Sequence, residues 1–177
     1  MSKLGDFGFV NQSVTGGGNT FAPYYGSFYD TTDQTCPSGS IKAMQLNTTD
    51  ATCTSGFSIE NNTLAEPTRI KALFPGVYNL QFSTQLYRAT QGQQKTCTIW
   101  LRKSETNIPD TATIVTMQAN ADYLVAAWNF YVNLTAGQYV ELMWSQNDDI
   151  SLQYLPEDLV TPHPAVPSVI ATISKIN

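Results

Sequence analysis

The segment at residues 76–87 constrains the fold of this chain more than any other. Within it, Tyr78, Leu80 and Phe82 alternate with polar residues, which is the period-two pattern of a strand with one buried and one polar face. A strand buried on both faces of a parallel sheet would be apolar at nearly every position, so the alternation favours an antiparallel sheet. A second segment of this kind at 136–144 indicates that the chain is a series of such strands.

Turn signals rich in Gly, Pro, Asn and Asp recur at short intervals from Tyr24 onward, and no segment combines a helical apolar period with caps. We therefore predict an all-β domain of about ten strands, in which two antiparallel sheets form a jelly-roll sandwich. The expected strands are 24–29, 41–46, 56–59, 68–73, 77–87, 96–103, 113–118, 123–134, 139–145, 151–154 and 168–176.

Composition allows one core and excludes several classes of partner. The 177 residues are 42% hydrophobic, enough for a single domain that we place at 24–177. A net charge of -5 gives no electrostatic basis for binding nucleic acid. No segment approaches the roughly 20 apolar residues of a membrane span, so we expect no membrane insertion.

Residues 1–23 differ from the rest because they are rich in glycine and carry isolated aromatic residues, Phe7, Phe9 and Phe21. Such a segment loses too much backbone entropy to order on so few apolar contacts. We predict a flexible N-terminal arm that orders on a partner; the alternative is a frayed terminus without function.

The first ten residues lack the apolar core of a signal peptide, which predicts synthesis and folding in a cytoplasm. Three cysteines, Cys36, Cys53 and Cys97, are an odd number for a disulfide framework. We expect free thiols, with Cys97 buried in a strand, and keep a Cys36–Cys53 bridge as the alternative.

Two expected strands are apolar on both faces. Trp100 lies on the opposite face from its apolar neighbours, and so do Tyr139 and Met143 in the later strand. Each sheet of a sandwich has one inner face, so this second row must be covered by a loop or by another subunit. We favour a subunit.

The chain shows no signature of catalysis or of metal binding. His163 lies in a proline-rich loop, and nothing in the sequence places a nucleophile or an orienting group beside it. Carboxylates in turns, such as Asp148 and Asp149, lack the spacing of a dedicated calcium loop. We predict no enzyme activity and no cofactor, catalytic or metal site.

Three motifs resemble the trimeric jelly rolls of the tumour-necrosis-factor and complement type. The segment PGVY at 75–78 is similar to their Gly-x-Tyr strand, LTAGQYVEL at 134–142 to a later strand, and PSVIATI at 167–173 to the last strand, which lies beside the three-fold axis. The resemblance implies a homotrimer. The residues that we assign to its interface are Trp100, Tyr139, Met143, Val169 and Ile173.

Three further segments, YGSFYDTTDQT at 25–35, IWLRK at 99–103 and AAWNF at 126–130, are similar to small virion proteins of tailed bacteriophages with this fold. That resemblance implies a capsid decoration protein on the outer surface of the head, made in the bacterial cytoplasm, whose N-terminal arm binds the major capsid protein. The alternative is a head-fibre or tail-tip module that recognises glycan or protein on the host cell surface. A hydrolase is a third, weaker hypothesis.

Overall fold

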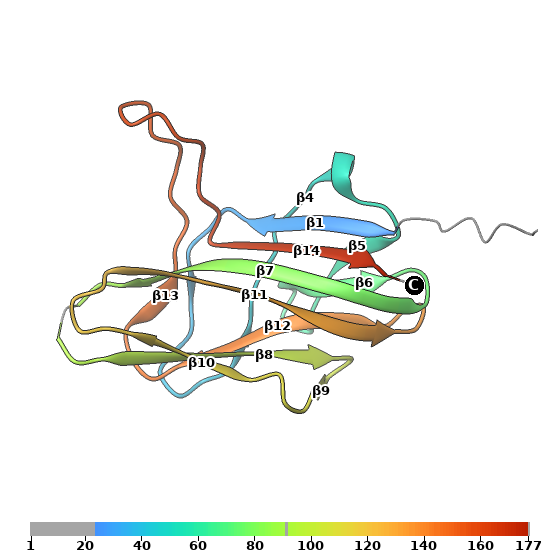
Figure 1. Ribbon diagram of the computed structural model, residues 1–177, viewed down its shortest axis with the longest axis horizontal. Helices are drawn as coiled ribbons and strands as arrows, with labels where there is room; N and C mark the ends of the chain where they lie inside the picture. Colours follow the sequence, from blue (N-terminus) through green and yellow to red (C-terminus); the bar gives the residue numbers. More distant parts are fainter. Residues whose placement is uncertain (1–23, 91, 177) are drawn as a thin grey trace, which may run out of the picture.

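The computed structural model describes residues 24–90 and 92–176, which form two antiparallel sheets packed face to face (Figure 1). Within this part of the chain the helical element is one three-residue 3-10 turn, η1 (Ala51–Cys53). Sheet A contains β1 (Tyr25–Asp30), β2 (Gln34–Thr35), β4 (Thr48–Thr49), β7 (Gly76–Arg88), β11 (Tyr123–Leu134), β13 (Ile150–Leu152) and β14 (Val169–Lys175). Sheet B contains β3 (Lys42–Ala43), β5 (Phe57–Asn61), β6 (Pro67–Ala72), β8 (Lys95–Lys103), β9 (Thr106–Asn107), β10 (Thr113–Met117) and β12 (Tyr139–Gln146).

Strand β7 organises sheet A, as its alternating sequence predicts. One of its edges pairs with β11 from Gly76 to Tyr87, and its other edge pairs with β14 and then with β13. Beyond β14, β1 and β4 complete the sheet. Because every one of these pairs is antiparallel, residues opposite one another point to the same face, and the register defines which side chains share a surface.

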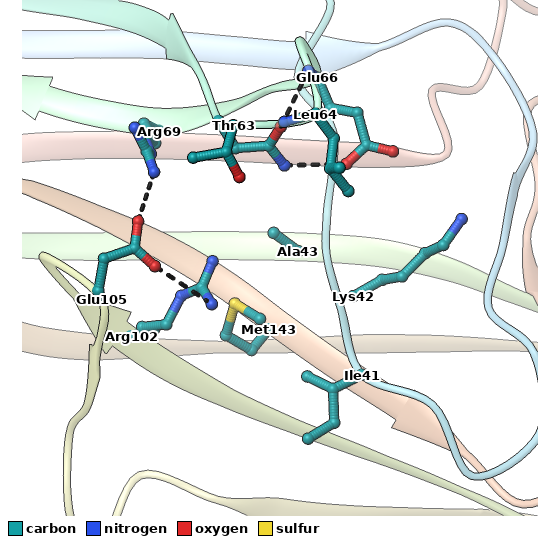
Figure 2. Close-up of a pocket in the computed structure, with 11 residues that line it drawn as sticks. Ile41, Lys42, Ala43, Thr63, Leu64, Glu66, Arg69, Arg102, Glu105 and Met143 are labelled. Carbon is teal, nitrogen blue, oxygen red and sulfur yellow. Dashed lines mark hydrogen bonds and ion pairs between the residues drawn. The ribbon is translucent and has the colours of Figure 1, made fainter.

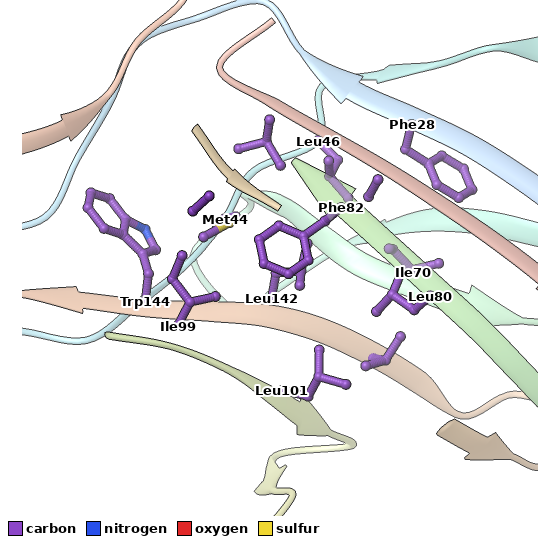
Figure 3. Packing of buried hydrophobic residues seen from close by; sticks show 14 of the residues in the cluster. Phe28, Met44, Leu46, Ile70, Leu80, Phe82, Ile99, Leu101, Leu142 and Trp144 are labelled. Atoms are coloured by element: carbon purple, nitrogen blue, oxygen red, sulfur yellow. The ribbon is translucent and has the colours of Figure 1, made fainter. Parts of the chain in front are cut away.

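The core lies between the sheets (Figure 3). The inward row of β7 includes Tyr78, Leu80 and Phe82. These side chains belong to one buried cluster with apolar residues of β8 and β12 such as Leu101 and Trp144. Phe82 also makes an edge-on contact with Trp128 of β11, with ring centroids 4.7 Å apart. This single apolar layer confirms the predicted all-β sandwich.

Polar groups close one end of the core where β1 stops. The carboxylate of Asp30 is fully buried and accepts hydrogen bonds from the backbone N–H of Thr32 at 2.8 Å and of Asn47 at 3.2 Å. The backbone N–H of Ser168 donates to the carbonyl oxygen of Asp30 at 3.0 Å. A buried carboxylate satisfied in this way fixes the loop after β1 beside the start of β14.

Each of the eleven expected strand segments overlaps a strand of the structure, and β11 has the predicted bounds. The prediction omitted β2, β4 and β9, which are two residues long each, and η1. The predicted N-terminal arm, with Phe7, Phe9 and Phe21, lies outside the described residues.

Candidate functional site

The outer face of sheet A is uncharged across four neighbouring strands. Three rows of residues cross β1, β14, β7 and β11 on this side of the sheet. None of these twelve residues is charged, and Tyr25, Tyr131 and Ile170 are among the exposed large apolar side chains of the chain. The rows are Tyr25, Ser174, Asn79 and Tyr131; Ser27, Thr172, Gln81 and Asn129; and Tyr29, Ile170, Ser83 and Ala127.

Contacts within this face are neutral as well. The side-chain amide of Asn129 donates to the side-chain oxygen of Asn79 at 3.2 Å. At the end of the face where β11 begins, the rings of Tyr87 and Tyr123 lie 5.0 Å apart. Aromatic residues without charges are typical of the buried part of a protein interface, whereas a solvated sheet face normally carries charged side chains.

The outer face of sheet B has the opposite character, because it carries a network of two arginines and two glutamates. Glu141 of β12 is fully buried; its carboxylate accepts from Arg102 Nε and Nη2 at 2.9 Å and from the Thr68 hydroxyl at 2.7 Å. Arg69 Nε lies 3.9 Å from the same carboxylate. Glu105, after β8, pairs with both Arg69 and Arg102, as Figure 2 shows.

Tyr139 joins this network from β12. Its hydroxyl donates to Glu105 Oε1 at 2.7 Å, and the Arg69 guanidinium lies 4.5 Å from the centre of its ring. That hydrogen bond, together with the nearby arginines, lowers the pKa of Glu105. Burial, and then the bond to Glu105, raise the pKa of Tyr139 to about 12.

Beside the network lies a cavity of about 400 Å³ (Figure 2). Arg69, Arg102 and Glu105 form its charged side, while Met143 and the exposed side chains of Ile41 and Leu64 supply apolar surface. Planar groups that donate and accept hydrogen bonds beside apolar surface suit a small polar ligand with an apolar face.

Three of the predicted interface residues, Trp100, Tyr139 and Met143, do share the outer face of sheet B. Trp100 and Met143 are direct partners across β8 and β12. Met143 is 3% exposed, and Trp100 Nε1 donates to Asn107 of β9 at 2.9 Å. Segments of the same chain therefore cover Met143 and contact Trp100 and Tyr139. Cover by a loop, the alternative to cover by another subunit, describes this apolar row better.

The other two predicted interface residues, Val169 and Ile173, point inward. They are 0% and 2% exposed and belong to the core. The outward residues of β14 are Ile170, Thr172 and Ser174. The assignment to the last strand therefore has to move by one residue, which exchanges the two faces of a strand. The sequence signal for the two faces is Thr172, a polar residue in the outward row of β14.

All three cysteines are free thiols, and no Cys36–Cys53 bridge forms. Cys36 and Cys97 are buried and Cys53 is exposed. Burial raises the pKa of Cys97 to about 12. The thiolate is the reactive form of a cysteine. Cys97 is therefore unreactive for two reasons: reagents cannot reach it, and its thiol stays protonated at neutral pH.

Cys97 should therefore report unfolding. In a Cys36→Ser, Cys53→Ser variant, the remaining thiol is expected to be inert to Ellman's reagent at pH 8 in buffer and to react fully in urea. The serine at position 36 can still donate to the Ser40 carbonyl oxygen that the Cys36 thiol contacts at 3.3 Å. Complete reaction within minutes without denaturant would contradict the burial of Cys97.

His163 lies in the connection between β13 and β14, where its Nδ1 lies 2.8 Å from the carbonyl oxygen of Pro164. Among the described residues, no group of three His, Cys, Asp or Glu side chains is arranged to hold a metal ion. No helix in residues 24–90 or 92–176 is long and apolar enough to cross a membrane.

Two solved structures share this architecture. Murine APRIL at pH 5.0 aligns with a TM-score of 0.52 and 11% sequence identity over 87% of this chain and 99% of that chain. Eiger TNF from S. frugiperda aligns with a TM-score of 0.53 and 11% identity over 88% of this chain and 93% of that chain. At this identity the likeness establishes the fold alone, a jelly roll of the tumour-necrosis-factor type. No protein-family model and no curated protein matches the sequence.

Proposed function

We propose that the chain is a non-enzymatic binding protein that assembles as a homotrimer through the outer face of sheet A. The observation that carries this proposal is the contrast between the twelve uncharged residues of that face and the arginine–glutamate network on the outer face of sheet B. Desolvating neutral side chains costs far less than desolvating charges, so sheet A is the face that another subunit can cover. The sequence resemblance to trimeric jelly rolls supports three as the number of copies.

We further propose that the trimer is a bacteriophage capsid decoration protein on the outer surface of the head. The sequence resemblance at 25–35, 99–103 and 126–130 supports this function. A protein that binds the assembled shell, but not its free subunits, stabilises the shell by mass action, and the three chains of a trimer add their contacts. The partner is then the major capsid protein, and residues 1–23 supply Phe7, Phe9 and Phe21 as contacts.

A receptor-binding head-fibre or tail-tip module is the second candidate. The cavity beside Arg69 and Arg102 favours it, because guanidinium and carboxylate groups can bind the hydroxyl groups of a sugar while Leu64 and Ile41 contact its apolar face. The host surface would then be the partner, and the fold supports either function.

Light scattering and capsid binding test the main proposal together. We expect a mass of three chains and sedimentation with purified expanded capsids, and deletion of residues 1–23 should abolish the binding while the protein remains an assembly of three chains. The matched control is a Leu64→Glu variant, whose substitution lies at the rim of the cavity and should leave capsid binding intact. Capsid binding that survives the deletion, together with adhesion to host cells that Leu64→Glu removes, would favour the receptor-binding module instead.

A further inference from the structure

The connection between β13 and β14 forms a hairpin that leaves the sandwich and projects past β1 and β4 (Figure 1). Its two segments are bridged at Leu155 and Val166, whose backbone hydrogen bonds measure 2.9 and 2.8 Å, and again at Asp158 and His163. We call residues 155–166 the projecting hairpin. Leu159 and Val160 at its tip are 82% and 89% exposed, so the subunit itself provides no cover for them.

The base of the projecting hairpin is fixed to the end of β1. The backbone N–H of Tyr154 donates to Asp33 Oδ1 at 2.8 Å, and Ser168 is tied to buried Asp30 as described above. Prolines at 156, 164 and 167 restrict the backbone further. A hairpin held in this way loses little conformational entropy when it binds a partner.

A cavity of about 430 Å³ lies in the angle between the projecting hairpin and the outer face of sheet A. Tyr29 and Ile170 form its floor on the sheet side, and Tyr154, Pro164 and Ala165 form the wall on the hairpin side. We call it the hairpin-base pocket. None of the residues that line it is charged, which makes it continuous in character with the face that we propose as the trimer interface.

A complementary apolar edge lies on the same face of sheet A, at the opposite end of the strand order and near the same level along the strands. The row through Tyr29 and Ile170 ends at Ala127 of β11, and the next two outward residues of β11 are Val125 and Tyr123. Val125 is 55% exposed and Tyr123 is 50% exposed. The pocket and this edge therefore occupy the two flanks of one face, near the same end of the strands.

Rotation about an axis parallel to the strands carries a residue around the ring without changing its level along the strands. A closed ring built by such rotations uses heterologous contacts, in which one flank of each copy meets the opposite flank of the next. A pocket and a projection at matching levels can satisfy that requirement, whereas two features at opposite ends of the strands cannot.

Resting on the trimer proposed above, we infer that Tyr123 and Val125 of one copy occupy the hairpin-base pocket of the next copy. The projecting hairpin then extends along the neighbouring subunit and contributes a wall of the pocket in every contact. The occupant of the pocket is a second copy of this chain, and the hairpin serves as a clasp between subunits.

Cysteine cross-linking tests the contact directly. In a Cys53→Ser background, the substitutions Val125→Cys and Ala165→Cys place one thiol on each side of the expected contact, while Cys36 and Cys97 stay buried. A short bis-maleimide is expected to give covalent trimers on a denaturing gel. The matched control combines Ala165→Cys with Ile114→Cys on β10, which is 68% exposed and lies on the other sheet, and should give none.

Val125→Arg provides a second measurement that does not depend on cross-linking. Placing a guanidinium in an uncharged pocket should raise the dissociation constant about 30-fold for each of the three equivalent contacts of the trimer, the effect of losing one strong interaction in each. Ile114→Arg adds the same charge elsewhere and should leave the constant unchanged.

The outcomes separate this inference from the proposed function. The clasp is overturned, and the trimer stands, if the protein has a mass of three chains but cysteines at 125 and 165 do not cross-link. The same conclusion follows if the control pair cross-links equally well. A mass of one chain for the unmodified protein overturns the trimer and the clasp together. A Val125→Arg variant whose dissociation constant equals that of the unmodified trimer also overturns the clasp and leaves the trimer standing.

Discussion

Replacing Thr172 with aspartate is expected to turn the trimer into monomers. Thr172 is exposed in the subunit and lies in the middle row of the outer face of sheet A, between Ser27 and Gln81. A carboxylate there would be buried in the interface with no cation among its row neighbours, at a cost of roughly several kcal/mol per ion. Since each of the three copies carries the substitution, light scattering at micromolar concentration should report a single chain of 19.5 kDa.

Two variants separate the effect of charge in the interface from an effect on folding. Thr172→Val keeps the shape of the side chain without a charge and should remain trimeric. Ile114→Asp introduces the same carboxylate at an exposed position of sheet B and should also remain trimeric. A Thr172→Asp protein that keeps the mass of three chains would exclude the outer face of sheet A as the interface.

The sequence predicted the strands well because their periodicity is strong and local. In β7 polar and apolar residues alternate over many positions, and β11 is rich in the aromatic and β-branched residues that favour strands, so the existence and extent of both strands are encoded in single segments. The two-residue strands β2, β4 and β9 carry no measurable period. They exist because a partner strand pairs with them, and that information lies elsewhere in the chain.

The faces of the strands were harder to predict than the strands themselves. Residues 169–173 of β14 read Val, Ile, Ala, Thr and Ile, so both rows contain apolar side chains. The core takes Val169, Ala171 and Ile173, and the row with Thr172 faces outward. Thr172 is the polar residue that distinguishes the two rows, whereas a resemblance to a family whose last strand lines an axis concerns the strand as a whole and not its individual faces.

The cover over the second apolar row could not be read from sequence. Tyr139 is bonded to Glu105, which lies 34 residues earlier, and Met143 lies beside Ile41 at the rim of the charged cavity. These contacts depend on how loops fold over sheet B. An apolar row predicts that a cover exists, but its origin is a question of tertiary structure.

Replacing Arg102 with methionine is expected to destabilise the subunit by about 3 kcal/mol, near the lower limit for breaking a buried ion pair. Arg102 supplies the two N–H groups that contact the Glu141 carboxylate at 2.9 Å, and Glu141 is fully buried. After the substitution the carboxylate keeps the Thr68 hydroxyl, while Arg69 Nε lies 3.9 Å away. Urea unfolding followed by tryptophan fluorescence should show a lower midpoint with an unchanged slope.

A double variant separates two contributions to the free energy of unfolding: the stabilisation by the Arg102–Glu141 ion pair, and the cost of leaving the Glu141 carboxylate buried without its partner. Replacing a buried ion pair by apolar residues of similar volume is often neutral, so Arg102→Met with Glu141→Leu should recover most of the lost stability. Lys71→Met is the matched control: the Lys71–Glu60 pair spans 2.7 Å but is 30% and 43% exposed, and its loss should cost less than about 1 kcal/mol. All variants are compared at one protein concentration, because dissociation of an oligomer contributes to apparent stability. A double variant as unstable as Arg102→Met alone would show that the two side chains are needed for packing on sheet B rather than for each other's charge.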